Sequence, residues 1–282
     1  MRLSGRVAVV TGGASGIGTA LARRVVAEDA AGVVVADLDG AGAEAVARDL
    51  GDRAIGVGCD VTDEAALRAV LARAEDAFGP VDAFFANAGV AVGGDEQTPD
   101  DTWDLAFAVN VRAHVVAARL LVPGWLERGE GCFVAVASAA GLLTQIGVAP
   151  YCVTKHAAVA FAEWLSVTYG DRGVHVACVC PMGVDTPMLA AGMDTAAAAS
   201  VRSAGGVLTP ADVAAAVVDG LAEERFLILP HPEVLEFFRR KTSDYDRWLA
   251  GMRRLRRAVE SPGHDRRCTG GRDVRADRHL QR

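Results

Sequence analysis

The sequence predicts an α/β protein of the doubly wound type, in which a parallel sheet of seven strands is flanked by helices. Apolar runs of strand length recur along the chain, and longer segments with helical periodicity separate them. The runs are continuously apolar rather than alternating, which is typical of parallel strands that are covered on both faces. The expected strands cover residues 6–12, 32–37, 54–60, 81–86, 132–138, 174–180 and 226–230.

The chain divides into three parts by composition. Residues 1–231 hold all seven expected strands and form the main domain. Residues 232–260 form an amphipathic helical extension whose arginines lie mostly off its apolar stripe. That stripe consists of Phe238, Tyr245, Trp248, Met252, Leu255 and Val259. Residues 261–282 have almost nothing apolar to bury, so we expect a disordered tail.

Composition and charge narrow the functional classes. With 282 residues, of which 51% are hydrophobic, the chain can bury a large core. Residues 1–238 carry 15 basic and 30 acidic side chains, whereas residues 239–282 carry 14 basic and 6 acidic ones. An acidic body repels phosphates, so we expect no nucleic-acid partner. The six scattered cysteines form no CxxC pair, which indicates reduced thiols and no metal site.

Two features of the sequence bear on the location of the protein. No apolar run reaches the ~18 residues that a membrane-spanning helix requires. Residues 1–5 lead directly into the first expected strand rather than into a signal peptide. We therefore expect a cytoplasmic protein without membrane association.

A glycine-rich loop, TGGASGIG, follows the first expected strand over residues 11–18. Gly12, Gly16 and Gly18 allow a tight turn, a close approach of the backbone to a pyrophosphate, and close packing of the next helix. Ser15 and Ile17 belong to the same loop. Its place between a strand and a helix favours a dinucleotide-binding site over an ordinary turn.

An acidic residue at the end of the second strand bears on the choice of cofactor. Asp37 follows Gly18 by 19 residues, close to the ~20-residue spacing at which a carboxylate binds the adenosine ribose. Its charge would repel the 2′-phosphate of NADP, and the neighbouring Ser15 and Leu38 add no positive charge. The sequence therefore predicts NAD.

Two further loops follow the third and fourth strands. Asp60 and Val61 follow one strand, and Asn87, Ala88 and Gly89 follow the other. Ligands of doubly wound sheets bind at the carboxyl ends of strands, so these residues are candidates for the cofactor site. Ordinary turn chemistry would also account for them.

Tyr151 and Lys155 form the most informative pair in the chain. They lie four residues apart, on one face of a helix. An ammonium group at this distance favours the phenolate, so we expect Lys155 to lower the pKa of Tyr151. A phenol tuned in this way can exchange a proton with a substrate oxygen. Lys155 is also the only lysine before Lys241 in a chain that otherwise uses arginine.

These motifs together resemble the short-chain dehydrogenase/reductase family over residues 5 to about 230. The matching residues are Thr11 to Gly18, Asp60 and Val61, Asn87 to Gly89, Asn110, Ser138, Tyr151 and Lys155. The resemblance implies a Rossmann fold, with Tyr151 as general acid/base and Lys155 as its pKa modifier and ribose ligand. It further implies that Ser138 orients the substrate oxygen and that Asn110 anchors a water relay from Lys155.

The resemblance also extends past the sixth strand. Pro181, Val184 and Thr186 match the family pattern and are implied to contact the nicotinamide. Met182 stands where the family usually has glycine, and it adds apolar bulk near the substrate. Beyond it, the small and apolar side chains of residues 187–206 suggest a flap over the cleft and an uncharged substrate.

Three functions remain open at this point. The first is an NAD-dependent oxidoreductase that interconverts a secondary alcohol and a ketone. The others are an NADP-linked carbonyl reductase, which Asp37 disfavours, and a non-catalytic NAD-binding protein, which the set Asn110, Ser138, Tyr151 and Lys155 disfavours. Apolar residues on several faces of the helices near 101–128 and 151–169 predict a homodimer or homotetramer. For the arginine-rich extension we expect docking on an acidic body, with a membrane or another partner as alternatives.

Overall fold

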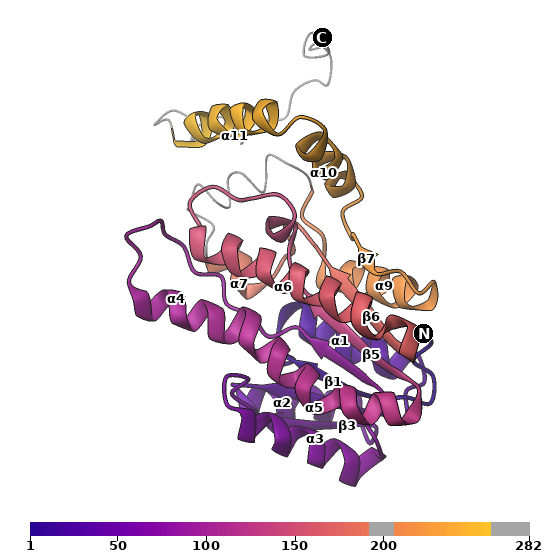
Figure 1. Cartoon of the computed structure of the whole chain (residues 1–282). Helices are drawn as coiled ribbons and strands as arrows, with labels where there is room; N and C mark the ends of the chain where they lie inside the picture. The colour runs from indigo at the N-terminus through magenta and orange to yellow at the C-terminus, as the bar shows by residue number, and fades with distance from the viewer. Residues whose placement is uncertain (192–205, 261–282) are drawn as a thin grey trace, which may run out of the picture.

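The computed structural model describes residues 1–191 and 206–260, and it confirms the predicted fold class. Seven parallel strands form one sheet in the order β3-β2-β1-β4-β5-β6-β7 (Figure 1). The order reverses between β1 and β4, the place where doubly wound sheets bind their ligands. The strands are β1 (Val7–Thr11), β2 (Gly32–Asp37), β3 (Ala54–Gly58), β4 (Ala83–Ala86), β5 (Gly131–Val136), β6 (Val174–Val179) and β7 (Leu227–Ile228).

Helices cover both faces of the sheet, as the continuous apolar strands require. One face carries α3 (Glu64–Phe78), α5 (Ala113–Arg128) and α6 (Ala149–Tyr169), and the other carries α1 (Gly16–Ala27), α2 (Gly40–Leu50) and α9 (Pro210–Ala222). Side chains alternate between the two cores along each strand, so Val9 and Phe84 face one core and Val10 and Phe85 face the other. The sheet is therefore the middle layer of three.

Local signals fix where several helices begin. The side chains of Asp39 and Asp63 accept hydrogen bonds from backbone N–H groups in the first turns of α2 and α3. At α9 the Thr209 hydroxyl accepts from the backbone N–H of Asp212, and the Asp212 carboxylate accepts from that of Thr209. These caps satisfy N–H groups that would otherwise lack partners.

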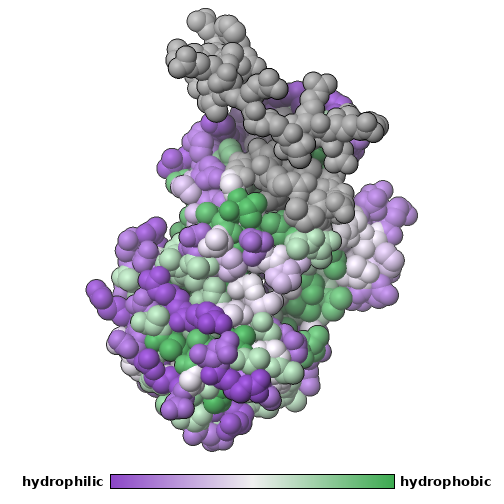
Figure 2. All heavy atoms as spheres, turned by 180° about the vertical axis from the view of Figure 1, so that it is seen from behind, coloured by the Kyte–Doolittle hydropathy of each residue, from purple (hydrophilic) through white to green (hydrophobic). Residues whose placement is uncertain are grey.

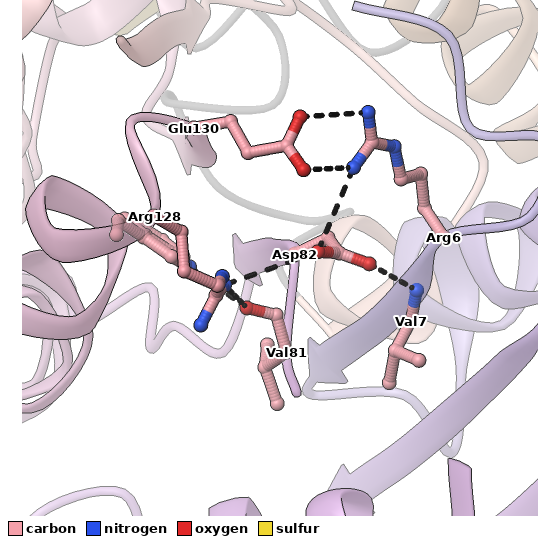
Figure 3. A network of polar contacts seen from close by, with 7 residues as sticks. Arg6, Val7, Val81, Asp82, Arg128 and Glu130 are labelled. Atoms are coloured by element: carbon pink, nitrogen blue, oxygen red, sulfur yellow. Dashed lines mark hydrogen bonds and ion pairs between the residues drawn. The ribbon is translucent and has the colours of Figure 1, made fainter. Parts of the chain in front are cut away.

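A cluster of ionic side chains fastens the sheet at the end opposite to the carboxyl ends of the strands (Figure 3). Asp82, just before β4, accepts a hydrogen bond of 2.9 Å from the backbone N–H of Val7 in β1. Arg6 and Arg128 each place a guanidinium nitrogen 3.8 Å from the Asp82 carboxylate. Arg6 also forms a bidentate pair with Glu130 at 2.7 and 2.8 Å. The cluster ties β1, β4 and the entry to β5 together.

The longest helical segment runs over Asp100–Arg128 and has an irregular turn within it. It consists of α4 (Asp100–Phe107), a π-helical turn (Ala108–Arg112) and α5. By length and composition alone this segment could cross a membrane, and 56% of its most apolar window is buried inside the protein. Trp125 and His114 on α5 lie fully within the core. The apolar character of α5 thus serves packing against the sheet.

The C-terminal extension differs from the single helix that the sequence predicts. It forms two helices, α10 (Glu233–Ser243) and α11 (Tyr245–Glu260), separated at Asp244, whose backbone is extended. The Asp244 carboxylate accepts a hydrogen bond of 2.9 Å from the N–H of Arg247, so it caps the start of α11. The predicted stripe is therefore divided, with Phe238 on α10 and the rest on α11. The predicted tail, 261–282, lies outside the described residues.

Candidate active site

A cleft of about 1520 Å³ opens at the carboxyl ends of the strands. It exceeds the ~300–1,000 Å³ typical of a site for one drug-sized ligand. Nearly all of the site residues expected from the sequence line it: Gly12, Ser15, Gly16, Ile17, Asp37, Leu38, Asp60, Val61, Asn87, Ala88, Gly89, Ser138, Tyr151, Lys155, Pro181, Val184 and Thr186. Gly18 and Asn110 do not line the cleft.

The glycine loop brings the start of α1 to the cleft. Gly12 and Gly16 have positive φ angles of 64° and 52°, which favour glycine. A Cβ atom on Gly18 would lie 1.9 Å from the carbonyl oxygen of Gly12, so this glycine serves the packing of α1 beneath the loop. The Ser15 side chain makes no capping hydrogen bond to the first N–H groups of α1, and Ser15, Gly16 and Ile17 line the cleft. This cradle fits a pyrophosphate.

Asn87 braces the loop from the neighbouring strand. Its amide nitrogen donates to the carbonyl oxygens of Thr11 at 2.9 Å and Gly12 at 3.1 Å. The Thr11 hydroxyl accepts from the backbone N–H groups of Asn87 and Ala88, both at 3.1 Å. Thr11 and Asn87 therefore hold the loops after β1 and β4 in one arrangement.

The far end of the cleft carries two carboxylates that are already hydrogen bonded. Asp37 accepts from the backbone N–H of Ala14 at 2.9 Å and of Asp39 at 3.0 Å, so it faces the glycine loop. Asp60 accepts from the backbone and hydroxyl of Thr62, at 2.9 and 2.7 Å. Leu38 beside them is 78% exposed and offers apolar surface. The carboxylates and the apolar surface at this end fit an adenosine; the contact of Asp37 with its ribose stays a prediction.

The inner end of the cleft brings Ser138, Tyr151 and Lys155 together. Ser138 follows β5, and its hydroxyl is close enough to the Tyr151 phenol to lower the pKa of that phenol. Lys155 is 4% exposed, and its Nζ donates to the carbonyl oxygen of Val136 at 3.0 Å. Nζ also lies 5.8 Å from the centre of the Tyr151 ring. The α6 helix thus presents both side chains on one face, next to the end of β5.

The electrostatics of this group differ from the sequence-based expectation. Removal from water raises the pKa of Tyr151 above its usual value, and the hydrogen bond to Ser138 acts in the opposite direction. The expected lowering of the Tyr151 pKa by Lys155 is therefore not found. Burial also lowers the pKa of Lys155 to about 8.

Asn110 lies behind this group rather than in the cleft. It is fully buried in the π-helical turn, and π-turns are frequent at functional sites. Its Oδ1 accepts from the N–H of Val90 at 2.9 Å, and its Nδ2 donates to Val90 O and Thr154 Oγ1, both at 3.0 Å. The side chain therefore ties the loop after β4 to α6. The water relay stays a prediction.

The loop after β6 closes the cleft from the opposite side. A Cβ atom on Gly16 would lie 2.9 Å from Cγ2 of Thr186, so this loop touches the glycine loop. Pro181 accepts a hydrogen bond of 2.8 Å from the N–H of Ala139, which fixes it beside Ser138. Met182 lines the cleft, and its N–H donates to His231 Nδ1 at 3.1 Å. Of the predicted flap, residues 192–205 lie outside the described part of the chain.

Sequence reasoning missed the outer wall of the cleft, which α10 and α11 provide. Their lining side chains include Phe237, Arg240, Arg247, Trp248, Met252, Arg254 and Leu255. In a space-filling view from behind, apolar surface gathers in the middle of the molecule (Figure 2). The sequence left an acidic body, a membrane and another partner as docking surfaces for the extension. In the structure the extension contacts the main domain of its own chain. The signal that could have indicated this was Lys241, the second of only two lysines.

Comparison with known proteins gives the family. A family model described as short chain dehydrogenase matches residues 6–196. The chain belongs to the short-chain dehydrogenase family. Relatives in this family are dehydrogenases of CH–OH groups, and the chain is accordingly an NAD(P)-dependent oxidoreductase.

Several relatives illustrate the range of this family. The chain is 37% identical to the 1-deoxy-11-beta-hydroxypentalenate dehydrogenase of Streptomyces exfoliatus, over 83% of this chain and 86% of the relative. It is 35% identical to the 2,5-dichloro-2,5-cyclohexadiene-1,4-diol dehydrogenase LinX of Sphingobium indicum, over 67% and 77%. It is also 41% identical to the inactive 2-(S)-hydroxypropyl-CoM dehydrogenase 2 of Xanthobacter autotrophicus, over 53% of this chain and 65% of the relative.

Solved structures of short-chain dehydrogenases agree with the fold. The enzyme from Burkholderia phymatum in complex with NAD superposes with a TM-score of 0.79 at 31% identity, over 87% of this chain and 96% of that one. The 3-ketoacyl-(acyl-carrier-protein) reductase from Brucella melitensis, complexed with NADH, gives 0.73 at 30% identity, over 81% and 95%. Among the described residues of this chain, no cluster of three or more His, Cys, Asp or Glu side chains could hold a metal ion.

Proposed function

We propose that the protein is an NAD-dependent oxidoreductase that interconverts a secondary alcohol and a ketone, with Tyr151 as general acid/base. The observation that carries the proposal is the shape of the cleft: Ser138, Tyr151 and Lys155 meet at one end and Asp37 lies at the other. The glycine loop between them fits the pyrophosphate that would join the two halves of the cofactor.

The residues at the inner end divide the chemistry. Bound NAD would supply the acceptor for the hydride that leaves the carbinol carbon. Tyr151 takes the proton of the substrate hydroxyl as the carbonyl forms, and returns a proton in the reverse direction. Ser138 holds the substrate oxygen by a hydrogen bond. Lys155, placed behind the phenol, binds the nicotinamide ribose, and Asn110 keeps the loop after β4 and α6 in register.

The alternative is an NAD-binding protein without catalytic activity. One relative is named as inactive. In this chain Asn110, Ser138, Tyr151 and Lys155 are all present, and the last three line one cleft. A screen of secondary alcohols with NAD, followed by absorbance of NADH, tests the proposal. Absence of turnover across apolar, cyclic and acidic alcohols would favour the alternative.

The proposed preference for NAD gives the first prediction. Asp37→Asn keeps the shape of the side chain but removes the charge that would repel a 2′-phosphate. We expect the ratio of NADPH to NADH dissociation constants to fall about tenfold, which corresponds to ~1.4 kcal/mol. Fluorescence titration of both cofactors measures it. Asp63→Asn, on the cap of α3, is the matched control, and an unchanged ratio in Asp37→Asn would mean that another residue selects the cofactor.

We also propose a cytoplasmic homodimer or homotetramer. On α4 and α6, Leu105, Phe107, Val153, Trp164 and Val167 are 40% to 86% exposed. Apolar side chains gathered on neighbouring helices favour an interface between copies of the chain. Light scattering at micromolar concentration is expected to give a dimer or tetramer. Trp164→Arg should shift the mass toward the monomer, and a monomeric parent protein would contradict the proposal.

A further inference from the structure

The helices α10 and α11 are anchored to the site through Lys241. This side chain is only 6% exposed, and its Nζ donates to the carbonyl oxygens of Leu142 at 2.7 Å and Leu143 at 2.8 Å. Nζ also lies 5.5 Å and 5.2 Å from the ring centres of Tyr245 and Trp248. A buried ammonium held by two carbonyls and two aromatic faces is well satisfied. It fixes the start of α11 relative to the main domain.

The carbonyl groups that bind Lys241 lie close in sequence to Ser138, at the inner end of the cleft. Leu142 follows the short 3-10 helix Ala139–Gly141, which Ser138 caps by accepting a hydrogen bond of 3.1 Å from Ala140. One continuous stretch therefore joins Ser138 to the carbonyls that hold Lys241. Lys241 holds α11 against this stretch, and side chains of α11 line the same cavity as Tyr151.

The side chains that α11 presents to the cavity are of two kinds. Trp248, Met252 and Leu255 are half-buried and apolar, and they face the cleft together with Leu143, Met182 and Met188 of the main domain. Arg247 and Arg254 line the same cavity. They are seven residues apart and so lie on nearly the same face of α11, about 10 Å from each other along its axis.

The charges around this part of the cavity are not balanced. Arg240 pairs with Glu236 at 2.9 Å, whereas Asp244, which also lines the cavity, is one carboxylate beside the two arginines and accepts a hydrogen bond from the backbone N–H of Arg247. Within residues 1–191 and 206–260, the guanidinium groups of Arg247 and Arg254 form no ion pair. Guanidinium groups bind carboxylates through paired, charge-assisted hydrogen bonds. An apolar cavity with two unpaired guanidinium groups at its outer wall suits a ligand that is apolar in the middle and anionic at one end.

We propose that the substrate is an apolar alcohol or ketone with a carboxylate remote from the reacting carbon, and that Arg247 and Arg254 bind this carboxylate. The inference rests on the proposed function and names its substrate class. It replaces the uncharged substrate that the small side chains of residues 187–206 suggest.

The test uses a series of hydroxy acids of increasing chain length, with the hydroxyl on the penultimate carbon, and their methyl esters. The full-length protein is expected to show a kcat/KM at least ~10-fold higher for the best acid than for its ester. In the double variant Arg247→Gln/Arg254→Gln this preference should disappear, mainly through KM. The double variant Arg239→Gln/Arg253→Gln removes the same amount of charge, one arginine from α10 and one from α11, at positions outside the cavity lining, and it should keep the preference.

A binding measurement separates this inference from the proposed function. Calorimetric titration of the NADH-saturated protein with decanoate should give an affinity about 10- to 100-fold lower in Arg247→Gln/Arg254→Gln than in the control variant. Turnover of alcohols without any dependence of acid preference or decanoate binding on these arginines would overturn the inference. Decanoate binding that depends on them, without turnover of any alcohol, would support the anion site and overturn the proposed function.

Discussion

Tyr151→Phe is expected to lower kcat by about 10²- to 10⁴-fold, the usual contribution of a general acid or base. The substitution removes only the phenolic oxygen, so the ring keeps its place above the Lys155 ammonium group. The affinity for NADH should therefore change less than about threefold, which is ~0.7 kcal/mol. Steady-state kinetics and a fluorescence titration of NADH measure the two quantities on the same preparation.

Tyr169→Phe is the matched control for this variant. Tyr169 lies at the end of the same helix, against Trp164, and does not line the cleft. Loss of the Tyr169 hydroxyl should leave both kcat and the affinity for NADH unchanged. Turnover of Tyr151→Phe within tenfold of the parent protein would rule out the role proposed for Tyr151, whatever the control shows.

Gly18→Ala is expected to weaken NADH binding at least ~10-fold and to destabilise the fold by about 1–3 kcal/mol, the typical cost of forcing atoms into a packed site. The new methyl group would lie 1.9 Å from the carbonyl oxygen of Gly12 and 2.7 Å from Nδ2 of Asn87. To make room for this methyl group, the glycine loop must move away from the Asn87 side chain that holds it. Thermal unfolding and NADH titration report the two effects.

Gly124→Ala provides the comparison for Gly18→Ala. Gly124 also lies within a helix, but the nearest neighbour of an added Cβ would be the flexible end of Arg128, at 3.8 Å. There the substitution should be neutral or stabilise the protein by about 0.5–1 kcal/mol, because alanine favours a helix. If Gly18→Ala behaved in the same way, the packing of α1 under the loop could not be what this glycine supports.

The fold could be predicted because its signals are local. The apolar runs of β1, β2, β4, β5 and β6 are covered on both faces, so hydrophobicity alone marks these strands, whereas the edge strand β3 is only partly buried. The expected seventh strand, 226–230, shortens to Leu227–Ile228 because it is an edge strand that pairs only with β6 and meets Pro230. Edge strands have fewer partners to define their length.

The candidate site was predictable where its residues sit in motifs, and less so where contacts are long-range. Gly12, Asp37 and Tyr151 occupy positions that spacing can identify. The bond from Lys241 to Leu142 spans 99 residues, and no periodicity in the sequence reports such a contact. The pKa of Tyr151 is a similar case, because the balance between burial and neighbouring charge depends on the depth of the cleft.

The two lysines of this chain, Lys155 and Lys241, are both buried, at 4% and 6% exposure. The basic side chains at the protein surface are therefore guanidinium groups, which acylating reagents for primary amines do not modify under mild conditions. A lysine-specific protease likewise finds no accessible cleavage site on the folded main domain or its C-terminal helices. Cleavage after Lys241 requires α10 to leave the loop at Leu142. The rate of cleavage at this one site would therefore measure how often α10 and α11 move away from the cleft.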